Sequence, residues 1–536
     1  MLLTKNLKVK FLGITPVLKD KTGVLNPQEI VALSALLTFK GKSIKKLFAE
    51  IGGKGEKVSD KIKTILQKSS LRGHASLSTT PSLCLTYEGS KFLDSTLTGI
   101  YFSSSLVSSG RRTRTTEKDI VFPEGILRDR RTRKIYQETS EKIIQFFNSL
   151  LTQKIQKDEA SKILQYGIYG TGIIQLPIET IIGLKKEYQK EKEWMPQELG
   201  LLLKVIEKTA KKLGIDWLYS TREAAPRNVY PYPNIFKNPK EINLTRELRN
   251  KISLKNGSEL ISTDILITPE LKKRLLELDR EVKSTFSSLK EIKKSWQKLL
   301  SLRQSILRDY NSALRIKVLS AIPWRIWGEK KRHRTCPQII ESIYYCVERT
   351  AQRLNKYKKQ IKVGKTGGKI VREIEEVFSI PPSIKRDQEL LHEYLLVGLT
   401  SLESYKKLIK LGIKPKEAIF VVPRAVKIDI LQEYDLYNLL TGYYPLRLCQ
   451  TAEEEMRRNT IREVGQIKKA LDDKGCGWLN KLIVPKCGLV GFCPEEKSCP
   501  MILGAVKNYN EEFHQEMKKE LKKQFEKNLK NLGGKS

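Results

Sequence analysis

Three adjacent side chains, Arg332, His333 and Arg334, are the clearest candidates for chemistry in this sequence of 536 residues. Each guanidinium group can donate paired hydrogen bonds to a phosphate or carboxylate, and the imidazole can donate or accept. Histidine occurs only four times in the chain, and Ser342 follows the triplet by eight residues on a segment with helical spacing. The cluster predicts an anion-binding site. The alternative is a solvated basic run in a protein rich in lysine.

The triplet and Ser342 resemble the signature of the flavin-dependent thymidylate synthases, with Tyr344 in the position of the signature's last arginine. Two other segments resemble further parts of the same family. The first half has a Gly-His-x-Ser element and a Ser-Gly-Arg element, formed by Gly73, His74 and Ser76 and by Ser109, Gly110 and Arg111. The second half has a segment like the family's carboxy-terminal part, with Pro423, Arg447, Ala452, Glu455 and Arg457.

Each of the two similar blocks, roughly residues 70 to 125 and 320 to 460, lacks what the other keeps. In the first block, Ile100, Tyr101 and Phe102 stand about where the second has its triplet. This pattern predicts an internal duplication. We therefore expect a first repeat over 1–225, a linker over 226–268, a second repeat over 269–500 and a basic helical tail over 501–536.

The resemblance implies the reductive methylation of dUMP to dTMP, with FAD, NADPH and methylenetetrahydrofolate. It makes the protein an FAD-dependent methyltransferase in which the flavin and the folate supply the chemistry and the chain supplies binding, orientation and electrostatics. The ligands are all anions, which suits a site of arginines. It also implies a homodimer or a higher homo-oligomer, because two duplicated chains could replace four single ones.

The resemblance also implies roles for individual residues. Arg332, His333 and Arg334 would contact the flavin and its phosphates, with His74 and Ser76 lining the same cofactor. Ser109 and Arg111 would hold the nucleotide phosphate, with Ser342 as the lesser copy of that serine. Arg447 would polarise the uracil ring. The catalytic candidates are thus Arg447, Arg111 and Ser109, and the substrate-binding candidates are Ser109, Arg111, Ser342 and Arg447.

Three positions depart from the family pattern. Tyr344 and Ile419 replace arginines, and Glu329 replaces a glutamine just ahead of the triplet. These departures leave a degenerate, non-catalytic paralogue of the synthase as an alternative.

The net charge of +39 could support binding to nucleic acid by counterion release. The lysines, however, alternate with glutamates at helical spacing along the chain, which is typical of solvated helix faces. A basic nucleic-acid-binding protein is therefore the second alternative, and stacked aromatic side chains on a basic face would favour it.

The eight cysteines do not form a disulfide pattern in a chain of this length. Cys476, Cys487, Cys493 and Cys499 are close in sequence, but they lack the Cys-x-x-Cys pair typical of zinc sites. Packed thiols without a metal are the first interpretation, and zinc is the alternative. The chain has no apolar run long enough to span a membrane, and its first residues resemble a strand rather than a signal peptide. We expect a cytoplasmic protein.

We expect an α+β (mixed α/β) fold of two homologous halves, each a small sheet packed with long helices, where the division into halves is what the resemblance implies. The periodicity predicts helices over Pro27 to about Ile51 and Gly89 to Ser105, and strands over Leu83 to Tyr87 and Ala418 to Val422. The charged segment from Pro269 to Tyr310 is either one long helix or a helical hairpin.

Overall fold

The computed structural model describes residues 1–20, 23–50, 56–109, 115–254 and 257–533. The chain divides into two compact units. The first unit comprises Met1–Ile242, Pro323–Arg334 and Ile340–Ile428. The second comprises Asn243–Ile322, Thr335–Ile339 and Asp429–Ser536. A division by contacts is different from a division by repeats, so the repeat boundaries stay a prediction.

The first unit contains a four-stranded antiparallel sheet. Its strands are β2 (Lys8–Thr15), β5 (Ser82–Ser90), β8 (Tyr169–Pro177) and β6 (Ser104–Val107), in that order across the sheet. In β5 the buried side chains of Leu83, Leu85 and Tyr87 alternate with more exposed ones. This alternation places one face of the strand in the core, as the period of two in its sequence predicts.

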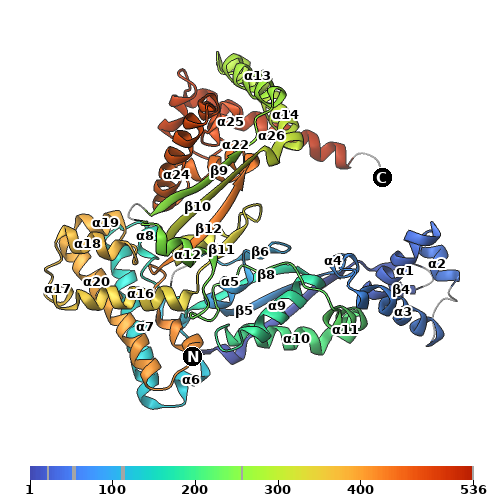
Figure 1. Ribbon diagram of the computed structural model, residues 1–536, viewed down its shortest axis with the longest axis horizontal. Helices are drawn as coiled ribbons and strands as arrows, with labels where there is room; N and C mark the ends of the chain where they lie inside the picture. The colour runs from blue at the N-terminus through green and yellow to red at the C-terminus, as the bar shows by residue number, and fades with distance from the viewer. Residues whose placement is uncertain (21–22, 51–55, 110–114, 255–256, 534–536) are drawn as a thin grey trace. The chain divides into compact units, whose positions relative to one another are not determined.

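Long helices surround this sheet. Two of 23 residues each, α7 (Arg130–Thr152) and α20 (Gln388–Lys410), pack against each other, as Figure 1 shows. The helices α9 (Ile178–Lys190) and α10 (Gln197–Leu213) follow β8 and pack together. Because α7 comes from the first half of the sequence and α20 from the second, both halves contribute to one compact unit.

The second unit is built on another four-stranded sheet. Its strands are β11 (Gln338–Ile340), β12 (Lys427–Asp435), β10 (Leu314–Pro323) and β9 (Ser258–Ile265). A helical hairpin of α13 (Pro269–Thr285) and α14 (Leu289–Tyr310) connects β9 to β10, and α24 (Glu454–Asp473) packs on β9 (Figure 1). Of the two alternatives for Pro269 to Tyr310, one long helix or a helical hairpin, the structure has the hairpin.

Numbered along the chain, the strands of both sheets are arranged in the order 1-2-4-3. The helices that follow the strands also come in a similar order in the two halves. In both halves the second strand runs into a seven-residue helix, which is α5 (Lys91–Leu97) after β5 and α15 (Trp324–Lys330) after β10. The mixed fold with small sheets and long helices is confirmed. The common topology agrees with two similar halves, while their common origin stays a prediction.

Three predicted elements were wrong. The helix predicted over Gly89 to Ser105 is only α5, because Gly99 adopts a φ of +86° and the chain turns into β6. The helix predicted from Pro27 breaks after α1 (Pro27–Lys40) at Gly41, whose φ is +62°; the predicted end at Ile51 lies outside the described residues. The strand predicted over Ala418 to Val422 is a 3-10 turn at Ile419–Val421, since a short apolar run has no distinguishing period.

None of the described helices combines the length and the apolar character needed to cross a bilayer.

Candidate functional site

The Arg332-His333-Arg334 triplet forms a tight turn directly after α15. The amide of Arg332 donates to the carbonyl of Glu329 at 3.2 Å, and the amide of His333 donates to that of Lys330 at 3.2 Å. Buried Trp324 and Trp327 fix the helix that precedes the turn. The turn leaves Arg332 exposed and His333 and Arg334 half-buried. The guanidinium group of Arg332 is therefore accessible to a ligand.

Arg334 carries a hydrogen-bond donor that its surroundings leave unused. Its Nε is buried and has no hydrogen-bond partner within the described ranges. Burial and the neighbouring Arg332 charge lower the pKa of Arg334. Buried donors are almost always paired in folded proteins, so an unpaired one beside the charged guanidinium group of Arg332 is suited to an anionic ligand.

A buried polar network lies in the other seven-residue helix, α5. Asp94 accepts hydrogen bonds from the Tyr87 hydroxyl at 2.6 Å and from the Lys91 ammonium at 2.8 Å. Burial raises the pKa of Asp94 and lowers that of Lys91. Glu198 supports the first turn of the helix by accepting a hydrogen bond from the backbone amide of Ser90 at 2.8 Å.

The helices α5 and α15 contact each other. The Lys331 ammonium donates to the Ser95 carbonyl at 2.6 Å, and the Trp324 indole donates to the Ser95 hydroxyl at 3.2 Å. The Phe92 and Trp324 rings meet edge to face, with centroids 5.6 Å apart. Gly99 allows a close approach here, since a Cβ on it would lie 2.9 Å from the Lys331 side chain. Burial and the charge of Arg332 lower the pKa of Lys331 well below its ordinary value.

Helix α5 also holds the segment that leads into Ser109. The Lys91 ammonium donates to the Ser108 hydroxyl at 2.5 Å and to the Ser108 carbonyl. Ser109 itself is half-buried, and the predicted site residues Gly110 and Arg111 lie outside the described residues. One short helix thus contacts the residue before Ser109 through Lys91 and the residue before Arg332 through Ser95.

Residues 285–471 match the sequence model of a family described as thymidylate synthase complementing protein. Over this region the sequence is similar to the flavin-dependent thymidylate synthase family. The match contains the triplet, Ser342 and Arg447, and it does not extend to the motifs of the first half.

Curated relatives with the name flavin-dependent thymidylate synthase agree with this match. The protein of Pyrococcus furiosus is 34% identical over 127 residues, which are 24% of this chain and 51% of the relative. That of Pyrococcus horikoshii is 35% identical over 141 residues, which are 26% of this chain and 56% of the relative. The chain therefore spans about half the length of the curated relatives it matches.

Among solved structures, the flavin-dependent thymidylate synthase of Helicobacter pylori complexed with FAD and dUMP is 15% identical. The alignment covers 42% of this chain and 99% of that one, with a TM-score of 0.27.

The predicted flavin residues His74 and Ser76 are both exposed and lie around the start of α4 (Ser76–Thr79). This helix packs on α9. It comes before the start of β5 in the chain, whereas α5 comes directly after the end of β5. Arg227 holds the loop by donating to the carbonyl of Gly73 at 3.0 Å. The predicted role of His74 and Ser76 in lining the flavin stays a prediction.

Three positions of the family signature are parts of the core. Ser342 precedes α16 (Ile343–Lys356) and donates to the Lys237 carbonyl at 2.6 Å. Tyr344 is buried and donates to the carbonyl of Trp194. Ile419 is fully buried. Where the family has arginines, Tyr344 and Ile419 thus serve packing.

Arg447 lies in the second unit, on α23 (Tyr443–Leu448), and is half-buried. The helix is fixed by Tyr443 and Tyr444, whose rings pack with Tyr434. Its proposed action on the uracil ring stays a prediction.

Three of the four cysteines that are close in sequence pack in two different hydrophobic clusters. Cys476 packs in the hydrophobic cluster that contains Tyr434, whereas Cys487 and Cys493 pack in the cluster around Phe513. Burial raises the pKa of the Cys487 thiol to about 11. Within the described ranges, no group of three or more histidine, cysteine, aspartate or glutamate side chains is arranged to hold a metal ion.

The sequence analysis missed the residues that connect the two motifs, Lys91, Asp94, Ser95 and Lys331. A signal was present, because Lys91 and Asp94 are the only charged residues of the segment from Gly89 to Ser105, which comes shortly after a predicted strand, and they lie three residues apart. Charged residues in such a setting are buried only when they are paired.

Proposed function

We propose that this protein is a flavin-dependent thymidylate synthase, which converts dUMP to dTMP with FAD, NADPH and methylenetetrahydrofolate. The observation that supports it best is the double role of α5. This helix holds the segment before Ser109 and the segment before Arg332, which are more than 200 residues apart in the sequence. This double role supports the proposal that both incomplete motifs contribute to one site.

The residues around the triplet fit the phosphate groups of a flavin nucleotide. Arg332 is exposed, and the buried Nε of Arg334 lacks a protein acceptor within the described residues. Both groups only donate hydrogen bonds, which suits a ligand rich in acceptors. When bound, the flavin would supply hydride transfer.

Further residues have supporting roles in this proposal. Ser109 and Arg111 bind the nucleotide phosphate, and Lys91 fixes the segment before Ser109 through Ser108. Arg447 polarises the uracil ring by binding its developing negative charge. His333 contacts the flavin, with His74 and Ser76 lining it. The protein acts as a homodimer or a higher homo-oligomer.

The test is the visible absorption spectrum of the purified protein with added FAD, followed by titration with dUMP. We expect a bound flavin spectrum that changes with dUMP and is lost in Arg332→Ala and in Arg111→Ala. Arg372→Ala, on α18 (Gly368–Glu375), is the matched control and should bind FAD normally. Absence of flavin binding in the wild-type protein would refute the proposal.

A non-catalytic paralogue is the second candidate, favoured by the burial of Tyr344 and Ile419 in the core. It predicts flavin binding without formation of dTMP. The test is product analysis by chromatography under single-turnover conditions with all co-substrates. Formation of dTMP would exclude this candidate.

The nucleic-acid interpretation has one structural feature in its favour. The rings of Tyr101 and Phe102 each meet Tyr230 edge to face, with centroids 5.5 Å apart, and Phe102 and Tyr230 are exposed. Exposed aromatic side chains can stack on bases. Titration with a fluorescent single-stranded oligonucleotide tests this function, which predicts weaker binding by Phe102→Ala.

A further inference from the structure

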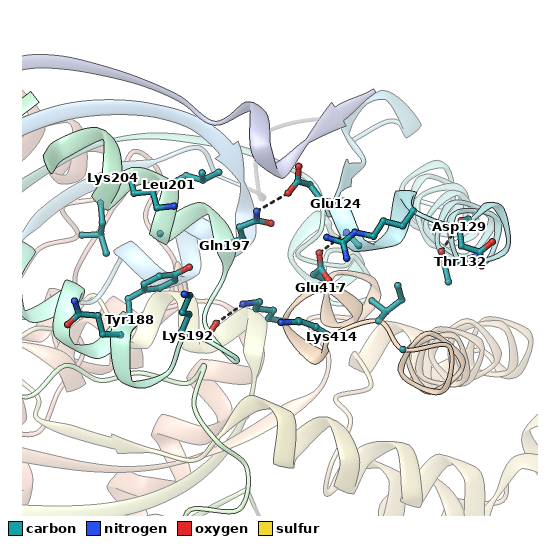
Figure 2. Close-up of a pocket in the computed structure, with 18 of the residues that line it drawn as sticks. Glu124, Asp129, Thr132, Tyr188, Lys192, Gln197, Leu201, Lys204, Lys414 and Glu417 are labelled. Atoms are coloured by element: carbon teal, nitrogen blue, oxygen red, sulfur yellow. Dashed lines mark hydrogen bonds between the residues drawn. The ribbon is translucent and has the colours of Figure 1, made fainter. Parts of the chain in front are cut away.

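The first unit has a second pocket that the proposed synthase site does not use. It encloses about 650 Å3 and is bordered by α6 (Glu124–Leu127), the start of α7, α9, α10 and the segment from Leu411 to Glu417. Figure 2 shows side chains from these elements around the cavity. Its volume lies in the range of sites that bind small molecules.

The carboxylates of the pocket are occupied by the protein itself. Glu417 accepts a hydrogen bond from the backbone amide of Gly125 at 2.7 Å, and Glu124 accepts one from the Gln197 side chain at 3.0 Å (Figure 2). Asp129 caps α7, and Glu207 binds Lys185 at 2.5 Å. Each of these carboxylates thus already has a hydrogen-bond or ion-pair partner in the protein.

Three cationic side chains of the pocket have no ion-pair partner among the described residues. Arg128, Lys192 and Lys204 all line the cavity, and none of them forms an ion pair with a carboxylate in the described part of the chain. They come from three places, namely the residue before the α7 cap, the second residue after α9 and the middle of α10. Together they present positive charge from several directions.

The remaining lining is partly apolar. It includes Tyr188, Leu201, Leu203, Leu411 and Ile413. The Tyr188 ring lies against Gly200, where a Cβ would be 2.8 Å from its Cε1, so that a glycine is needed in this turn of α10. A flat, apolar group could rest on this side while charged groups reach the cations.

We propose that this pocket binds a phosphorylated small molecule of nucleotide size, with Arg128, Lys192 and Lys204 binding its phosphate groups. Guanidinium and ammonium groups are the usual partners of phosphate, and the carboxylates that could compete are already paired. The apolar side chains add contact area for a base or another ring.

Isothermal titration calorimetry of the full-length protein with ADP and with pyrophosphate tests this inference. We expect saturable binding of ADP that is at least fivefold tighter than that of pyrophosphate. The triple variant Arg128→Gln, Lys192→Gln, Lys204→Gln should bind ADP at least tenfold more weakly. Equal affinity for the two probes would overturn the assignment of a nucleotide-sized ligand.

The matched control is Lys208→Gln, Lys211→Gln, Lys212→Gln, which removes the same charge from exposed residues of α10 outside the pocket. Its ADP affinity should stay within twofold of the wild-type value. Repeating the titrations in an Arg332→Ala background removes any contribution of the proposed flavin site. Equal losses of ADP affinity in both triple variants, or no saturable binding of ADP by the wild-type protein, would refute the proposal that this pocket binds the ligand.

Discussion

Lys91 is a buried cation whose ammonium group has three oxygen acceptors, one from Asp94 and two from Ser108. Sequence reasoning reached the triplet because consecutive Arg, His and Arg are visible in the letters. Sequence reasoning did not identify Lys91, because the role of this lysine is to connect two segments, those of Asp94 and Ser108. A contact between residues distant in sequence leaves no local pattern.

Replacing Lys91 by methionine should destabilise the protein by about 3 kcal/mol or more, because Asp94 would remain as an unpaired buried charge. The measurement is urea unfolding followed by circular dichroism. The double variant Lys91→Met, Asp94→Asn should recover part of the loss. A single variant as stable as the wild-type protein would contradict the buried ion pair.

Glu198 should make stability depend on pH. Burial raises its pKa from the ordinary 4.5 to about 7, so the folded state binds a proton that the unfolded state has released. The contribution is complete below about pH 4.5 and is lost as pH rises to about 7, by up to roughly 3 kcal/mol. Unfolding free energies between pH 4.5 and 8 should show a flatter profile for Glu198→Gln. An unchanged profile would assign the slope to other groups.

At the scale of whole elements, the hydrophobic periodicity of the sequence could not predict that α5 contacts α15. Strand β5 was predicted because its apolar residues alternate. The segment of α13 and α14 was predicted to be helical, but whether it is one helix or a hairpin stayed open. Helix α5 was predicted too long, since all seven of its residues are buried and none marks its end. Its end is set by Gly99, which faces Lys331 from the other half.

Gly99→Ala should cost about 1 to 3 kcal/mol, from the positive φ and from crowding against Lys331. Gly412→Ala is the control, because Gly412 has a φ of +84° and no atom within 4 Å of an added Cβ. Chemical denaturation should therefore show a larger loss for Gly99→Ala. Equal losses would show that Lys331 moves without cost.

For the whole molecule, composition predicted a globular fold with helices and sheets, and the motifs predicted two similar halves. The way in which the halves combine could not be predicted, because the pairing of α7 with α20 depends on contacts between segments more than 200 residues apart. The charge of +39 was also uninformative, since it is spread over many helix faces.

The two halves should bind one flavin together. After α15 the chain has the triplet, whereas after α5 it has Gly99, Ile100 and Tyr101, which offer no cationic group. Absorbance of the FAD released from saturated, denatured protein should give one flavin for each chain. Two flavins for each chain would contradict a single composite site.

The six chain segments that alternate between the two compact units have an evolutionary consequence. Neither unit is a continuous stretch of sequence, and α7 of the first half is covered by α20 of the second. A shortened gene with only one half would encode a helix without its packing partner. A first half without the arginine triplet would thus still be needed for folding, because α20 of the half that has the triplet packs against α7.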